Sequence, residues 1–229
     1  MDSDPDGIAR SNAALQRRTG TPDEISFRHA PFEPGDREGG PMSNASPYFR
    51  AMAYNNAWAN HRLLTACAKL SDAAFQAERV SFFPSIMATL NHNLTVDWFY
   101  VDALEGGTLG RKAWTNETPC PSIAALISEQ AAIDRRLIAV CDKLSDVSLA
   151  TETRMHRQDR VQADRTDRVL LHLFEHQIHH RGQAHAMLAG TDVKPPQLDE
   201  FFMTDEAPLR AEEFKTLGWT EAGVWKGLA

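Results

Sequence analysis

A histidine-rich helix near the C-terminal end is the most constraining feature of this sequence. Four of the nine histidines lie within residues 172–180, and the leucine and phenylalanine residues around them follow helical spacing. At 100° per residue, His176 and His180 lie one turn apart, with about 5–6 Å between their Cβ atoms. Val169 and Leu173 share that face, so we expect it to point into the protein. Buried imidazoles need partners, because an unsatisfied buried polar group costs about 1–3 kcal/mol. A divalent metal would satisfy them.

One helix cannot surround a metal ion alone. His172 and His180 would lie about 12 Å apart along the helix axis, since each residue rises about 1.5 Å. Two ligands of one ion are separated by only about 3–4 Å at ordinary metal–nitrogen bond lengths. The metal therefore takes one pair, either His172 with His176 or His176 with His180. The third ligand must come from another helix.

His92 is the candidate for that third ligand. It lies in a predicted helix whose same face carries small residues, Ala88 and Thr89, with Phe99 expected as an aromatic cover. Asp97 points well away from His92 and is a poor ligand candidate. Three histidines would leave at least one coordination position open, which is the arrangement of catalytic metal sites.

Helical periodicity predicts four long helices and one short helix, at residues 46–70, 85–105, 122–144, 166–188 and 209–217. Ser46 is expected as the first N-cap, with Pro47 at the first helical position. The polar segment 147–165 has no clear period and is not assigned as a hairpin. We therefore predict an all-α four-helix bundle with long crossover connections and a C-terminal extension, in which Trp219 and Trp225 pack the tail against the body.

The first 41 residues differ from the rest of the chain. They hold five glycines, five prolines and many charges, with little apolar periodicity. We interpret residues 1–41 as a flexible extension or as the result of a misassigned start, with translation beginning at Met42. Residues 42–229 would form the bundle and its packed tail.

The composition of the chain argues against two kinds of binding partner, nucleic acids and membranes. The net charge of −7 argues against a nucleic-acid binder, whose footprint is basic. No apolar run of about 18 residues exists, so we predict neither a membrane span nor a membrane partner. Three widely separated cysteines without a C-x-x-C motif fit free thiols in a cytoplasmic protein. Among them, Cys67 is expected in the core.

Five segments resemble the DinB/YfiT-like family of metal-binding four-helix bundles: residues 54–63, 89–98, 176–183, 195–202 and 207–210. The block from His176 to Gln183, which reads His-x-x-His-His-Arg-Gly-Gln, is the most specific of them. The resemblance implies that His92, His176 and His180 bind one divalent ion, commonly zinc or nickel, and that the protein is a homodimer. Proteins similar to this family include thiol-dependent transferases, among them a mycothiol-dependent maleylpyruvate isomerase, so a transferase is implied without a substrate.

Two classes of function fit these residues. In the first, the protein is an enzyme, a thiol S-transferase or a hydrolase, whose metal activates a small thiol or water for attack on a small electrophile. No catalytic side chain is assigned, but Asn56 and Asn60 would orient a substrate or form an interhelical hydrogen bond, and His179 would support the ligands. In the alternative, the protein is a non-catalytic, metal-stabilised stress-response or binding module.

Two neighbours of the histidines carry expectations of their own. Arg181, about 140° from His176 around the helix, is expected in a surface or interface salt bridge. Gly182 lies inside the helix at a cost of about 1 kcal/mol relative to alanine, which predicts a close approach of another backbone or a ligand.

Overall fold

The computed structural model describes residues 44–228, so the prediction for residues 1–41 lies outside the described part of the chain. The elements, in chain order, are α2 (Ser46–Cys67), α3 (Asp72–Gln76), α4 (Ile86–Leu104), the 3-10 helix η1 (Gly110–Trp114), α5 (Ile123–Cys141), α6 (Asp146–Leu149), β1 (Glu152–His156), β2 (Val161–Arg165), α7 (Thr166–Ala189), the 3-10 helix η2 (Thr204–Glu206), α8 (Ala207–Leu217) and α9 (Glu221–Val224).

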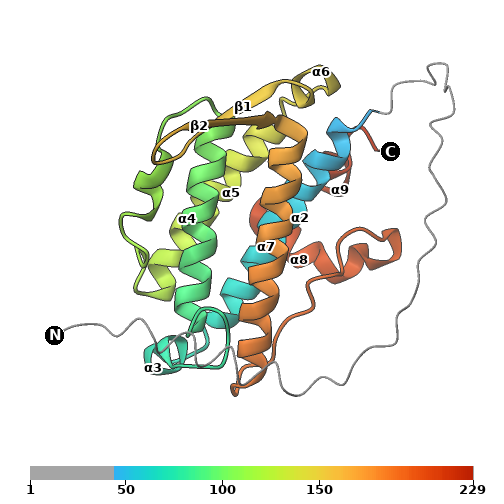
Figure 1. Cartoon of the computed structure of the whole chain (residues 1–229). Coiled ribbons are helices and arrows are strands. Elements are labelled where there is room, and N and C mark those ends of the chain that lie inside the picture. The colour runs from blue at the N-terminus through green and yellow to red at the C-terminus, as the bar shows by residue number, and fades with distance from the viewer. Residues whose placement is uncertain (1–43, 229) are drawn as a thin grey trace, which may run out of the picture. The chain divides into compact units, whose positions relative to one another are not determined.

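The four long helices enclose the main hydrophobic core. Helix α2 packs against α5 and α7, and α4 packs against the same two helices, so each long helix has two long neighbours (Figure 1). The core side chains come from all four and include Leu63, Leu94, Leu137 and Leu173, which are all less than 2% exposed. This mostly helical architecture confirms the predicted all-α class.

The start of α2 differs from the prediction. Ser46 is the first helical residue and not the N-cap, and the N-cap residue Ala45 has no side chain that can accept a hydrogen bond. The carboxylate of Asp146, far away in the sequence, caps the helix instead. Its Oδ1 accepts hydrogen bonds from the backbone N–H groups of Ala45 at 2.9 Å and of Ser46 at 3.1 Å. Because the cap comes from α6, no local pattern around residue 46 reveals it.

The polar segment before α7 forms a short antiparallel hairpin of β1 and β2, in which Glu152 pairs with Arg165 and His156 with Val161. The hairpin lies across one end of α4 and α7 (Figure 1). Of its residues, only Thr153 and Met155 on β1 are fully buried, so the apolar alternation that marks a strand is weak. That is why the sequence did not support assigning a hairpin.

The C-terminal tail packs on the outside of α2 through a second aromatic cluster. Trp58 of α2 is fully buried against Phe201, with ring centroids 5.4 Å apart. Trp219 contacts Tyr54 edge to face at 4.9 Å, and Trp225 joins the same cluster. The predicted packing of the tail by Trp219 and Trp225 is confirmed. None of the helices in residues 44–228 has the length and the apolar content needed to cross a bilayer.

Candidate metal centre

Three histidine side chains from two helices converge between α4 and α7. His92 comes from α4, and His176 and His180 come from successive turns of α7. One ring nitrogen from each lies within 4.8 Å of the other two. The Nε2 atoms of His92 and His176 are 3.0 Å apart. That separation is close to the spacing of about 3–4 Å that two ligands of one ion require.

The structure separates the two histidine pairs that helical geometry left open. Among residues 44–228, no fourth histidine, cysteine or carboxylate belongs to the cluster. His172 is exposed, and its ring lies against Tyr100 with centroids 5.3 Å apart and 6.4 Å from the ring of His176. The pair that shares the cluster with His92 is therefore His176 with His180.

The three imidazoles are held in the neutral form that metals require. Burial, together with the charge of His180, lowers the pKa of His92 to about 4. Burial and four neighbouring histidines lower the pKa of His176 to about 3, and burial also lowers the pKa of His180. The Nδ1 atom of His176 is buried and has no hydrogen-bond partner. Three neutral imidazoles, each with a ring nitrogen close to the other two, can offer three lone pairs to a divalent cation.

Gln183 orients one of these rings and was not singled out from the sequence. Its Oε1 lies 2.8 Å from Nδ1 of His180, and its Nε2 lies 3.0 Å from Nε2 of His179. If Nδ1 of His180 donates to Gln183, the Nε2 atom of His180 is left free to bind a metal. The spacing of three residues from His180 to Gln183 on one helix face is the signal that could have identified it.

The aromatic cover of the cluster comes from the loop before α4. The ring of Phe83 lies 4.3 Å from that of His92 and 5.5 Å from that of His180, measured between centroids. Phe99, the expected cover, instead packs against Tyr100 and Trp114. A helical wheel places only residues of the same helix, so it could not reveal a loop that folds over the site.

Arg181 is buried and forms no ion pair with the residues that the structure describes, which corrects the prediction of a surface or interface salt bridge. Its Nη1 donates to Oδ1 of Asn56 at 2.6 Å and to Oδ1 of Asn60 at 2.9 Å. Both asparagine amides donate in turn to the carboxylate of Asp134 on α5. The face of α7 that points away from His92 is also covered, because α7 packs on α4 and on α2. Asn56 and Asn60 thus form the interhelical hydrogen bonds that were one of their two expected roles.

A second carboxylate, Asp97, extends this polar network toward the histidines. Gln130 donates to Asp97 and to Asp134, and Gln177, the neighbour of His176, also donates to Asp97. Burial and repulsion from Asp134 raise the pKa of Asp97 to about 8, and burial raises that of Asp134 to about 6. At neutral pH the two carboxyl groups together therefore hold about one proton. The expectation that Asp97 points away from His92 agrees with these contacts.

Two further expectations have opposite outcomes. Gly182 is exposed, and a Cβ added to it would meet no neighbouring element within 4 Å, so the predicted close approach of another backbone is wrong for the described chain. Cys67 is fully buried, and burial raises the pKa of its thiol to about 12, which confirms its place in the core.

A comparison with known protein families matches the part of the chain that contains this site. The family model of DinB matches residues 42–213, a span that contains all three converging histidines and the asparagines of α2. No curated protein matches the chain.

Proposed function

This chain belongs to the DinB family, and we propose that it is a metal-dependent enzyme whose single divalent ion, zinc or nickel, is bound by His92, His176 and His180. The observation that carries the proposal is the convergence of three neutral ring nitrogens without a fourth protein ligand among the described residues. Structural zinc sites close all four positions with protein ligands, whereas catalytic sites keep one open. When bound, the ion would lower the pKa of a thiol or a water molecule that contacts it.

The surroundings favour a small thiol or water as nucleophile and a small electrophile as its target. A cavity of about 370 Å³ lies between α4, the hairpin and α7, and none of the three converging histidines lines it. His172, one turn before His176, lines it together with Tyr100, Arg157 and Arg168. Asp164 also lines the cavity, but the guanidinium groups of the two arginines outnumber its carboxylate and suit an anionic group, such as a carboxylate, on one of the two substrates. Phe83 would shield the opposite side of the cluster from water.

The proposal is tested by thiol transfer in the metal-loaded protein. Wild type loaded with zinc or nickel should accelerate the reaction of a small thiol with an electrophile that carries a carboxylate. His176→Ala should abolish the acceleration, whereas His172→Ala should keep the metal because His172 lies outside the cluster. Arg157→Gln should raise KM for the anionic substrate more than it lowers kcat.

The alternative, a non-catalytic module in which the ion joins α4 to α7, gives a different result. Metal removal would then lower the melting temperature while no thiol, with any electrophile, reacted faster than in buffer. Cobalt-substituted protein separates the two cases directly. Its visible spectrum should change on addition of a small thiol if a coordination position is open, and should stay constant if the site is closed.

A further inference from the structure

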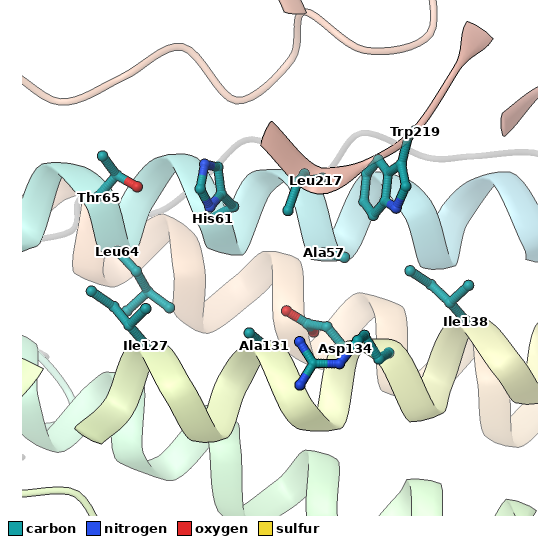
Figure 2. Close-up of a pocket in the computed structure, with 11 residues that line it drawn as sticks. Ala57, His61, Leu64, Thr65, Ile127, Ala131, Asp134, Ile138, Leu217 and Trp219 are labelled. Atoms are coloured by element: carbon teal, nitrogen blue, oxygen red, sulfur yellow. The ribbon is translucent and has the colours of Figure 1, made fainter. Parts of the chain in front are cut away.

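A second cavity lies on the other side of the helices from the histidine cluster. It is enclosed between α2 and α5, with the segment after α8 across its top (Figure 2). Its volume is about 200 Å³. Apolar side chains form most of its wall, namely those of Ala57, Leu64, Ile127, Ala131, Ile138 and Leu217. None of the converging histidines lines it, so it is separate from the candidate metal centre.

The carboxylate of Asp134 is the buried polar group of this cavity. Figure 2 shows it between α2 and α5, below Ala57 and Leu217. Oδ1 accepts from Asn60 at 3.0 Å, from Gln130 at 3.1 Å and from Asn56 at 3.4 Å. Oδ2 accepts only from the Asn60 amide nitrogen that Oδ1 already uses, at 3.3 Å. Because a carboxylate offers about four acceptor sites, Oδ2 retains capacity for a further donor.

The charge of Asp134 has no directly contacting partner. Among residues 44–228, no Lys, Arg or His nitrogen lies within 4.0 Å of its carboxylate oxygens. Arg181 reaches it only through the amides of Asn56 and Asn60, which accept from the guanidinium and donate to the carboxylate. Buried charges are normally paired or bound to a cation, so a cation in the cavity would complete this arrangement.

We propose that the cavity between α2 and α5 binds a small organic monocation, a primary ammonium group on a single ring or a short alkyl chain. The ammonium group would donate to Oδ2 of Asp134, and the apolar body would fill the space between the two helices under Leu217 and Trp219. A dry engineered cavity of about 150 Å³ holds one benzene molecule, so the volume here fits one ring with its aminomethyl group. The aromatic side chain of Trp219 also favours a cation.

The other charged and titratable groups at the cavity set its selectivity. Arg135 and His61 also line it. Arg135 is exposed, so water and salt screen its repulsion of a bound ammonium group, but do not remove it. Arg181 and Asp97 lie farther from the cavity, and each is separated from Asp134 by an amide side chain. The carboxylate of Asp134 is thus the group nearest the ligand, and removal of Arg135 should strengthen binding.

The test uses benzylamine with its neutral counterpart benzyl alcohol, titrated into the full metal-loaded chain at neutral pH and followed by calorimetry or protein NMR. Wild type should bind benzylamine at least about tenfold more tightly than benzyl alcohol. Asp134→Asn should remove this preference, and Arg135→Gln should increase it. Ala131→Leu should block both ligands by filling the cavity while Asp134 stays in place, so the test stands even if Asp134→Asn folds poorly. His176→Ala should leave benzylamine binding unchanged.

Three results would overturn the proposal. One is equal affinity of wild type for the amine and the alcohol, which would make the cavity an unselective apolar space. Another is amine binding that persists in Ala131→Leu, which would place the ligand elsewhere. The third is absence of binding together with a change of oligomeric state in Ala131→Leu, which would mean that a second copy of the chain covers this face.

Discussion

Replacement of Asp97 by asparagine should stabilise the protein, and the gain should grow with pH. Asp97 is 1% exposed and lies beside Asp134 across the side chain of Gln130. Asparagine has nearly the same shape as the protonated carboxyl group and keeps one acceptor for these amides. It also brings a donor for Oε1 of Gln177, which is buried without a partner.

The size of this gain in stability follows from the difference between the pKa values of Asp97 in the folded and the unfolded protein. Burial and Asp134 raise the pKa of Asp97 from 3.8 to about 8 in the folded protein. Between these values the folded chain holds a proton that the unfolded chain has lost, so the wild type loses stability as pH rises. The slope is at most about 1.4 kcal/mol per pH unit, and it disappears above pH 8. Asparagine does not ionise, so the stability of Asp97→Asn does not fall in this way. Its free energy of unfolding should exceed that of wild type by several kcal/mol at pH 8.

Urea denaturation of both proteins at a series of pH values between 5 and 9 measures this advantage. Any pH dependence of metal binding is common to both proteins and cancels in the difference. Asp159→Asn, which removes an exposed carboxylate whose nearest cation is 3.9 Å away, is the matched control and should follow wild type throughout. Parallel curves for wild type and Asp97→Asn from pH 5 to pH 8 would refute the reasoning about the buried pair.

Three further substitutions test other contacts. Gln183→Ala should weaken metal binding by about 10–100-fold in competition with a chromogenic chelator, because His180 loses the partner of its Nδ1; unchanged affinity would contradict the orienting role. Gly182→Ala should raise the free energy of unfolding by about 1 kcal/mol, since the position is helical and open; a loss of stability would show that something contacts this position in solution. Asp146→Ala should lower the free energy of unfolding by about 1 kcal/mol, because the N–H groups of Ala45 and Ser46 lose their acceptor; an unchanged urea midpoint would contradict that.

Much of the helical framework could be predicted because it depends on local pattern. Apolar residues recur at helical spacing in the long helices, and serine caps mark the starts of α4 and α5. The predicted ends of both helices therefore lie within three residues of the observed ones. His92 and His176 follow from the same geometry, since one face of each helix had to be buried. The choice between His172 and His180 could not be made from the helix alone, and only the resemblance favoured His180.

Two of the errors share one physical origin, namely that a helix can be covered on more than one side. The angle between Arg181 and His176 predicts a surface or interface salt bridge, but α2 covers that side of α7. The sequence-based predictions do not include Asp134 as a buried polar residue, although Gln130 and Asp134 lie one turn apart beside the buried residues Ile133 and Leu137. Two polar residues on an apolar face indicate a buried network, but their partners on α2 and α7 become known only from the fold.

The most direct test of the candidate metal centre is the metal content of the purified full chain, measured by inductively coupled plasma mass spectrometry. Wild type should contain about one divalent ion per chain, as expected for a single site with three histidine ligands. His92→Ala and His176→Ala should lose the ion, while His172→Ala should keep it because its side chain lies outside the cluster. A wild type without metal after incubation with zinc or nickel, or equal metal content in all four proteins, would contradict the three-histidine site.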